Sequence, residues 1–244
     1  MADLEFLLPG WDAPARVRAV MTTRTGGAST APYDSFNLAT HVGDQVEAVA
    51  ENRRRLREAL SLPSEPAWLE QVHGNAVAVL PEHPGGPADA AVTFTRGPVC
   101  AVLVADCLPV FLASRGGDRV GIAHAGWRGL AAGVVEATVA ALDCQPHELV
   151  AWLGPSIGPS AFEVGEEVRE AFLAGDAGAA GAFRRGRAGR WLADLPALAR
   201  RRLADAGIES IGGGDFCTVA DATRFFSYRR DGATGRMAAL AWLD

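Results

Sequence analysis

The chain has 244 residues, of which 49% are hydrophobic and 21% charged, a composition typical of a globular protein with a sizeable core. Its net charge of −6 excludes the basic surface expected of a protein that binds nucleic acid or an anionic membrane. No apolar run is long enough to cross a bilayer, and the first residues lack the basic start of a signal peptide, so we expect a cytoplasmic protein.

All 23 basic residues are arginines, and the chain contains no lysine. This excludes mechanisms that need a lysine, such as a Schiff base, a phosphate-loop lysine or a Ser–Lys dyad. An anionic substrate must therefore be held by arginine side chains or by backbone amides.

Hydrophobic periodicity predicts the elements of the first half of the chain. Residues 15–23 alternate as a strand, and the polar, glycine-rich residues 24–44 read as a long loop. Asp44 followed by Glu47 resembles a capping box that opens a helix to about Leu60. Strands are then predicted at residues 66–72, 75–80, 98–105, 108–113 and 119–123.

In the second half, a helix of about 14 residues is predicted after residues 127–129, and a strand near 148–153. A rigid turn at 154–159 leads to a helix at 165–174, a mobile surface loop at 175–190 and a helix at 194–206. Two strands, at 222–228 and 236–243, close the chain. Strict βαβ alternation is absent, so the pattern predicts an α/β (α+β) fold, one domain over residues 1–244 with mixed β-sheets and flanking helices.

Three short motifs each place one candidate metal ligand where an apolar run meets Gly or Pro. The motifs are residues 71–74 (QVHG), 105–109 (ADCLP) and 124–129 (HAGWRG), and the candidate ligands are His73, Cys107 and His124. Two imidazoles and a thiolate suit a zinc ion that keeps one position open for water or substrate. Copper could replace zinc there, because its intrinsic affinity for such ligands is higher.

Each motif has a simpler interpretation, because a single His or Cys at a strand end is commonly a structural residue. The coincidence of three motifs at the ends of successive apolar runs favours a metal or catalytic site. Asp106 has two open interpretations: it orients a ligand imidazole, or it points to the other side and supports the loop.

Several polar side chains are candidates for holding a sugar or a phosphate. Arg24 and Asn37 belong to the early loop, Arg53 lies on the helix that follows, and Arg128 stands beside backbone amides at a helix start. We rank Arg53 first, because a helix-borne guanidinium is better preorganised than Arg24 in a glycine-rich turn, and keep Arg128 in reserve. Ordinary loop composition is the alternative explanation for the residues in and beside the early loop. For the segment with Arg128, the alternative is a glycine-rich strand-to-helix turn in which Trp127 packs as a hydrophobic plug.

With these residues in view, the chain resembles the bacterial YfiH-type family, long described as polyphenol oxidase or laccase-domain proteins. The likeness covers nearly the whole chain, including the three central motifs and residues 22–27, 41–44, 153–158, 162–165, 227–230 and 235–236. It implies that His73, Cys107 and His124 bind zinc, and Asp106 is counted with them as a catalytic candidate. It also implies a fold similar to the catalytic domain of the cytotoxic necrotizing toxins.

The resemblance implies phosphorolysis of adenosine, inosine, guanosine and methylthioadenosine, together with deamination of adenosine. The expected partners are purine nucleosides and phosphate, and the expected state is a monomer or a weak homo-oligomer. Two alternatives stay open: a cysteine hydrolase or amidase that edits envelope precursors with Cys107 and His124, and a non-enzymatic, zinc-stabilised binding domain. Laccase chemistry is not expected, because the chain has five histidines and a multicopper oxidase needs far more.

Overall fold

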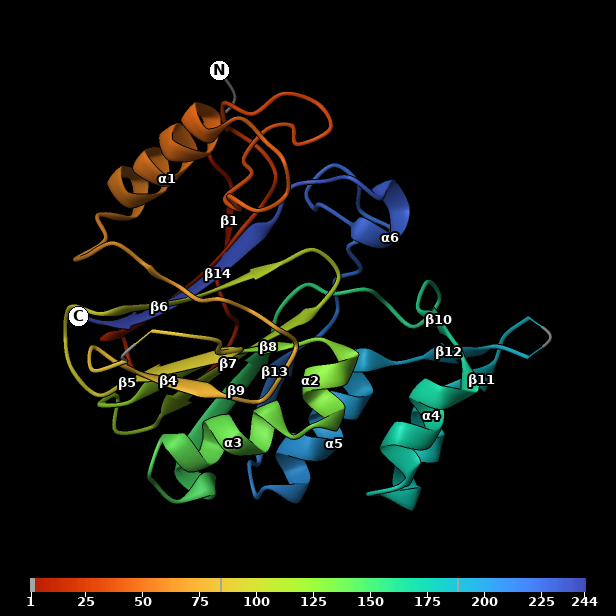
Figure 1. The fold of residues 1–244 in the computed structure, drawn as a ribbon. Coiled ribbons are helices and arrows are strands. Elements are labelled where there is room, and N and C mark those ends of the chain that lie inside the picture. The colour runs from red at the N-terminus through yellow and green to blue at the C-terminus, as the bar shows by residue number, and fades with distance from the viewer. Residues whose placement is uncertain (1–2, 84, 188) are drawn as a thin grey trace.

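The computed structural model describes residues 3–83, 85–187 and 189–244 and stacks four layers (Figure 1). A five-stranded and a six-stranded sheet pack face to face. The outer face of the first is covered by α1 (Val46–Leu60), and that of the second by α2 (Trp127–Ala131), α3 (Val134–Ala141) and α5 (Leu195–Asp205). None of the helices in these ranges has the length and apolarity needed to cross a membrane. The predicted mixed α/β fold with several sheets and flanking helices is confirmed.

The five-stranded sheet has the order β1-β2-β14-β6-β3. Its strands are β1 (Phe6–Leu7), β2 (Val17–Thr22), β14 (Met237–Leu243), β6 (Val99–Val104) and β3 (Ala67–Trp68). The C-terminal strand β14 lies between β2 and β6 and pairs antiparallel with both. The strand β14 therefore forms the centre of this sheet, and the residues just before β14 lie at one end of the sheet.

The six-stranded sheet has the order β13-β9-β7-β8-β5-β4. Its strands are β13 (Ser210–Gly213), β9 (Leu149–Leu153), β7 (Leu108–Ser114), β8 (Val120–Ala125), β5 (Ala90–Thr93) and β4 (Val77–Leu80). The strands β7 and β8 form an antiparallel hairpin in which Pro109 pairs with His124. This register places the residues before β7 next to the end of β8.

Both faces of the six-stranded sheet are buried, which explains its continuous apolar strands. Along β7, Val110 and Leu112 belong to the core under α3 and α5, whereas Phe111 and Ala113 belong to the core between the two sheets. A strand buried on both faces does not alternate between apolar and polar residues, and its length and flanking turns identify it instead.

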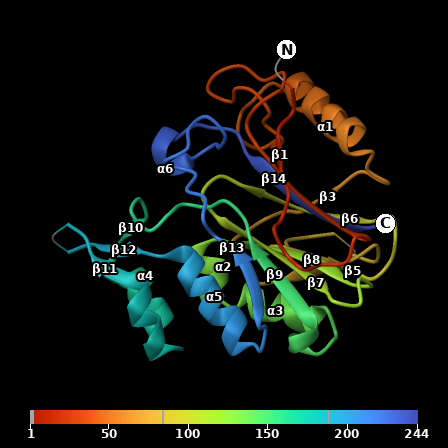
Figure 2. The ribbon, with the colours of Figure 1, turned by 180° about the vertical axis from the view of Figure 1, so that it is seen from behind.

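A small three-stranded sheet with α4 stands at the side of the molecule (Figure 2). Its elements are β10 (Glu163–Val164), α4 (Glu166–Leu173), the 3-10 helix η2 (Ala177–Ala182), β11 (Phe183–Arg185) and β12 (Trp191–Ala193). Another 3-10 helix, η1 (Pro146–Glu148), directly precedes β9. The prediction of a mobile loop at 175–190 is therefore wrong over η2 and β11, and residue 188 lies outside the described residues. Gly- and Ala-rich composition is a weak signal of structure when backbone pairing and packing supply the stability.

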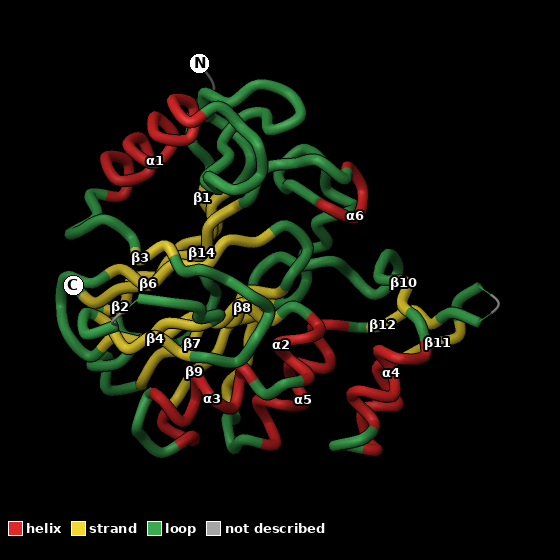
Figure 3. The backbone as a smooth tube through the Cα atoms, viewed as in Figure 1, coloured by secondary structure: helices red, strands yellow, loops and turns green. Residues whose placement is uncertain are grey.

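Other differences between the predicted and the observed elements have local causes. The predicted strand at 222–228 is wrong, because this segment is a loop that ends in α6 (Tyr228–Asp231), where the Ser227 hydroxyl accepts the Arg230 N–H. The single helix predicted after residue 129 is broken at Gly133, whose φ of 88° lies in the left-handed region. The long loop predicted at 24–44 is confirmed and lies beside α1 (Figure 3).

The expected capping box of α1 is absent. The residue that caps this helix is Gln45, which makes no side-chain cap hydrogen bond. The Asp44 carboxylate instead accepts hydrogen bonds from Ser29 and Asn37 and so closes the early loop on itself. The strand predicted at 66–72 is also shorter than expected, since β3 covers two residues.

Candidate metal centre

The three candidate ligands meet at the ends of strands in the six-stranded sheet. Cys107 immediately precedes β7, His124 lies near the end of β8, and His73 lies in the turn before β4 with a φ of 60°. Their ligand atoms all lie within 4.8 Å of one another. Within the described ranges, this is the group of His, Cys and acidic residues that could hold a metal ion.

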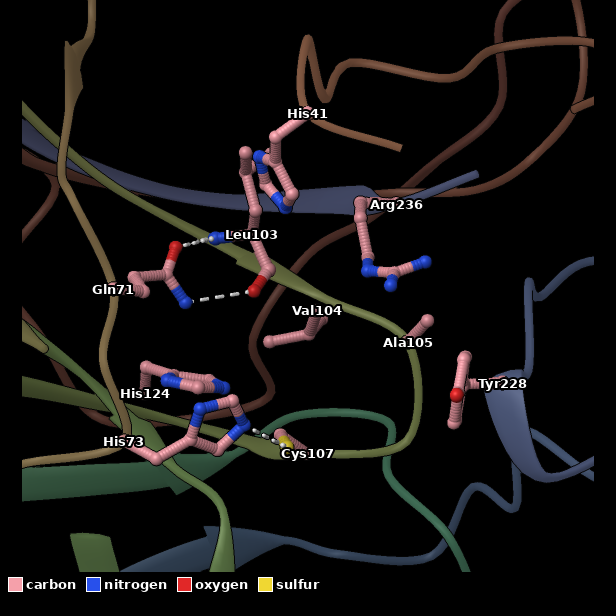
Figure 4. Close-up of a pocket in the computed structure, with 10 residues that line it drawn as sticks. All are labelled: His41, Gln71, His73, Leu103, Val104, Ala105, Cys107, His124, Tyr228 and Arg236. Carbon is pink, nitrogen blue, oxygen red and sulfur yellow. Dashed lines mark hydrogen bonds between the residues drawn. The ribbon is translucent and has the colours of Figure 1, made fainter. Parts of the chain in front are cut away.

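Both imidazoles turn their Nε2 atoms toward the thiol. The Nε2 atom of His73 lies 3.8 Å from the Cys107 sulfur (Figure 4). The Nδ1 atom of His124 lies 2.8 Å from a carboxylate oxygen of Asp89, which leaves its Nε2 for the cluster. The two rings stand edge to face with their centroids 4.8 Å apart. Three donor atoms therefore converge from three separate segments.

Asp89, which the sequence analysis did not single out, holds the cluster from behind. Its side chain is fully buried and accepts backbone N–H groups from Val72, His73 and Gly74 at 3.1, 2.9 and 2.7 Å. The same carboxylate binds Nδ1 of His124. One buried group thus fixes the turn that carries one histidine and the tautomer of the other.

Asp106 has the second of its two interpretations. Its carboxylate accepts the Thr218 hydroxyl at 2.5 Å and the backbone N–H of Arg229 at 2.7 Å, and no hydrogen bond joins it to either histidine in the described part of the chain. With a φ of 91°, Asp106 turns the chain sharply just before Cys107. Asp106 therefore ties the Cys107 loop to α6.

The charges of the cluster reinforce one another. Burial alone would raise the pKa of the Cys107 thiol, but the charges and hydrogen bonds of His124 and His73 outweigh it and lower the pKa to about 6. Burial would likewise lower the pKa of His124, but the Cys107 thiolate and Asp89 raise it to about 9. Burial opposes the ionisation of Asp89 as well, yet its bonds to His124 and to backbone N–H groups keep its pKa below the ordinary value. Each group therefore favours the charged form of its neighbour: His124 favours the Cys107 thiolate, and Cys107 and Asp89 favour the His124 imidazolium.

The donor set fits one metal ion. A thiolate with two imidazole nitrogens is a common ligand set for zinc, and three protein ligands with an open side are typical of catalytic rather than structural sites. The buried carboxylate behind His124 is the outer partner that metal-binding histidines usually have. The arrangement can therefore bind a metal ion.

A cavity of about 390 Å³ opens from the cluster, here called the Arg236 cavity (Figure 4). Besides the three candidate ligands, its lining includes His41, Gln71, Tyr228 and Arg236. Its volume is in the range of about 300–1,000 Å³ that small-molecule sites occupy. Gln71 is held in place, since its amide both donates to and accepts from the backbone of Leu103.

Arg236 is a half-buried cation in the wall of this cavity. Burial lowers the pKa of its guanidinium, which donates to the backbone oxygens of Thr234 and Gly235, and no carboxylate forms an ion pair with it among the described residues. Burial and the nearby guanidiniums of Arg236 and Arg53 also lower the pKa of His41, which is therefore neutral at pH 7. A half-buried cation that has no ion-pair partner in the described part of the chain favours an anionic ligand.

The other predicted substrate residues have different places. The Asn37 amide oxygen accepts the backbone N–H of Arg236, so Asn37 supports the cavity without lining it. Arg24 lines a separate surface pocket and pairs with Asp34. Arg53 donates to the Leu38 oxygen and lies over the Trp68 ring, outside both cavities beside the cluster.

A second cavity, here called the Trp127 cavity, has a volume of about 250 Å³ and adjoins the first. The two cavities share four lining residues: His73, Ala105, Cys107 and Tyr228. Its further lining is largely apolar and comprises Gly126, Trp127, Ile157, Phe162 and Leu195, with the polar Asp106, Arg128 and Arg229. Of the residues that the sequence analysis proposed for substrate binding, only Arg128 lines a cavity beside the cluster.

Comparison with known proteins gives consistent findings for the family, for individual relatives and for a solved structure. The family model described as multi-copper polyphenol oxidoreductase laccase matches residues 18–244. The chain is 54% identical over 241 residues to purine nucleoside phosphorylase YfiH of Escherichia coli, with 98% of this chain and 99% of the relative covered. It is 53% identical over 240 residues to a purine nucleoside phosphorylase of Pseudomonas aeruginosa, with 98% of each covered. A crystal structure of a Neisseria meningitidis protein matches with a TM-score of 0.95 and 50% identity over 98% of this chain and 99% of that chain.

Proposed function

This chain belongs to the family described as multi-copper polyphenol oxidoreductase laccase, and on that premise we propose that it is a zinc-dependent purine nucleoside phosphorylase that also deaminates adenosine. The names of its relatives from E. coli and P. aeruginosa support the first activity. The family's description does not favour oxidase chemistry here, because the described residues offer ligands for one metal ion and a multicopper centre needs several. The observation that carries the proposal is the His73–Cys107–His124 cluster, which opens into a cavity that contains Arg236.

We propose that Nε2 of His73, the Cys107 sulfur and Nε2 of His124 hold the zinc ion. Bound zinc supplies Lewis-acid chemistry, which polarises a substrate oxygen or makes water nucleophilic near neutral pH. The protein keeps His124 in the required tautomer through Asp89 and fixes His73 through the turn at residues 72–74. Copper fits the same donors and is an alternative occupant.

Arg236 is the residue that we propose to hold phosphate, with neutral His41 beside it. In phosphorolysis a nucleoside and hydrogen phosphate give ribose 1-phosphate and the free base, and the proton of hydrogen phosphate ends on the base. A desolvated guanidinium orients the dianion and screens its charge, so that an oxygen can approach C1′ of the ribose. Arg236 thereby replaces Arg53 as the first candidate, because Arg53 lies outside the cavity.

One experiment tests the proposed function directly. Metal-analysed protein is incubated with adenosine, inosine, guanosine and methylthioadenosine, with and without phosphate, and the products are identified. We expect free bases and sugar 1-phosphates only when phosphate is present, and inosine with ammonia from adenosine in its absence. Release of no base from any nucleoside in phosphate would contradict the proposal.

Asp89 and Asp106 offer a matched pair of buried carboxylates next to the cluster. Asp89→Asn is expected to lower zinc affinity by about 10- to 100-fold, because the outer partner of a ligand histidine sets its tautomer and orientation. Asp106→Asn should change zinc affinity much less, since its carboxylate contacts Thr218 and Arg229 instead. Competition with a chromophoric chelator measures both affinities. An equal loss in the two variants would mean that Asp89 acts on the fold in general.

A second candidate function uses the same residues. Cys107, His124 and Asp89 form a thiolate, an imidazole and an orienting carboxylate in series, which is the arrangement of a cysteine hydrolase. This candidate requires a metal-free site, because a thiolate bound to zinc is a poor nucleophile. Hydrolysis of amides by protein stripped of zinc, with loss on adding zinc back, would favour it over the phosphorylase.

A further inference from the structure

We propose that the Trp127 cavity is the purine subsite, in which Arg128 donates hydrogen bonds to the imidazole edge of the base at N7. This inference rests on the proposed function and adds an arrangement of the substrate to it. The phosphate lies in the Arg236 cavity, the base lies in the Trp127 cavity, and the ribose lies between them at Cys107 and Tyr228.

The relative position of the two cavities suits displacement at C1′. The bond from C1′ to N9 breaks with its electron pair leaving on the base, while a phosphate oxygen forms the new bond to C1′. The nucleophile and the leaving base must stand on opposite sides of the ribose. The two cavities adjoin along His73, Ala105, Cys107 and Tyr228, and the rest of their lining residues differ. They therefore offer two adjoining compartments, one for the nucleophile and one for the leaving base, with the shared residues between them.

The lining of the Trp127 cavity fits a flat heteroaromatic ring. Trp127 and Phe162 supply aromatic surface, and a guanidinium lies over each ring: that of Arg128 at 4.5 Å and that of Arg229 at 5.5 Å from the ring centroid. Purine rings stack on aromatic side chains and on guanidinium planes. The volume of about 250 Å³ is small for a whole nucleoside with phosphate and suits one part of it.

Arg128 brings to the Trp127 cavity N–H donors that no partner among the described residues uses. Its exposed guanidinium makes no hydrogen bond or ion pair within the described residues, and its contact is the stack on Trp127. Arg229, in contrast, donates to the backbone oxygens of Ala161 and Glu163. Negative charge accumulates on the imidazole ring of the purine as the bond to C1′ breaks, and N7 is an acceptor that arginine recognises well. A guanidinium at N7 stabilises the leaving base in the transition state.

Tyr228 completes the junction. Its side chain is 62% exposed and belongs to the lining of both cavities. The backbone next to it is anchored, because the Arg229 N–H donates to Asp106 and the Ser227 hydroxyl caps the turn. Asp106 thereby ties the backbone beside Tyr228 to the residue that precedes Cys107. A fixed backbone with an exposed aromatic ring provides a surface for the ribose at the cavity mouth.

Binding of free bases to the zinc-loaded protein tests the inference. Calorimetric titration compares hypoxanthine with 7-deazahypoxanthine, which lacks the N7 acceptor. The parent protein is expected to bind hypoxanthine about 10- to 150-fold more tightly, as a hydrogen bond from a charged donor predicts. Arg128→Gln should lose most of this preference. Trp127→Ala should weaken binding of both bases by about 5- to 150-fold, since the stacking surface is removed.

Arg236→Gln is the matched control, because it removes a guanidinium from the other cavity. It should weaken phosphate binding and keep the preference for hypoxanthine, whereas Arg128→Gln should keep phosphate binding. A parent protein that releases bases from nucleosides but binds both bases equally would overturn the subsite, as would an Arg128→Gln variant with the full preference. If the parent releases no base at all, the proposed function fails and the subsite fails with it.

Discussion

Replacing Cys107 with alanine is expected to abolish both phosphorolysis and deamination and to leave less than one zinc per chain after purification. Cys107 supplies the only sulfur of the cluster. The loss of zinc affinity should therefore exceed the roughly 10- to 100-fold loss that follows when a hydrogen-bond partner of a ligand is removed. The fold should survive, because the site lies at strand ends and two large cores on either side of the six-stranded sheet stay intact. Metal analysis, activity and thermal unfolding are measured on the same preparation.

Cys144→Ala is the matched control for this variant. Cys144 is half-buried like Cys107 but lies in a surface pocket with Asp143 and Pro146, away from the cluster. The control should retain zinc and activity. Loss of cooperative unfolding in Cys107→Ala, with normal unfolding of the control, would support the zinc-stabilised binding domain instead of a catalytic centre.

The second large effect is expected at Arg236. Arg236→Gln should raise the phosphate concentration needed for half-maximal phosphorolysis by about 10- to 150-fold, since a hydrogen bond to a charged group contributes roughly 1.5–3 kcal/mol. The nucleoside requirement should change little, and deamination should continue, because it consumes water and not phosphate. Steady-state kinetics of both reactions, with phosphate and nucleoside varied separately, provides the measurement.

Arg53→Gln tests the ranking derived from the sequence. Arg53 contacts the Leu38 oxygen and the Trp68 ring, so the variant should lose some thermal stability and keep its phosphate requirement. A rise in the phosphate requirement for Arg53→Gln but not for Arg236→Gln would restore Arg53 as the anchor. An equal loss of phosphorolysis and deamination in Arg236→Gln would mean that this residue holds the nucleoside or the fold.

The amino-acid sequence determined the class of fold and the three candidate ligands. Both depend on local signals: apolar runs of strand length predict β6, β7, β8, β9 and β14, and the identity of a His or Cys side chain at a strand end is visible directly. Such signals are weak for short or alanine-rich elements. The strand β5 (Ala90–Thr93) was missed for this reason, and Asp89, which directly precedes it, was missed with it.

The tertiary structure alone decided which polar residues meet the ligands. Asp89 reaches His124 because β5 pairs with β8, and Arg236 enters the first cavity because β14 pairs with β6 at the centre of the other sheet. Asp106 contacts residues more than 100 positions away in the sequence, and no local sequence pattern predicts these contacts. Side-chain chemistry is a property of the residue and can be read along the chain, whereas its hydrogen-bond partner follows from strand order and register, which are set by packing of the whole sheet.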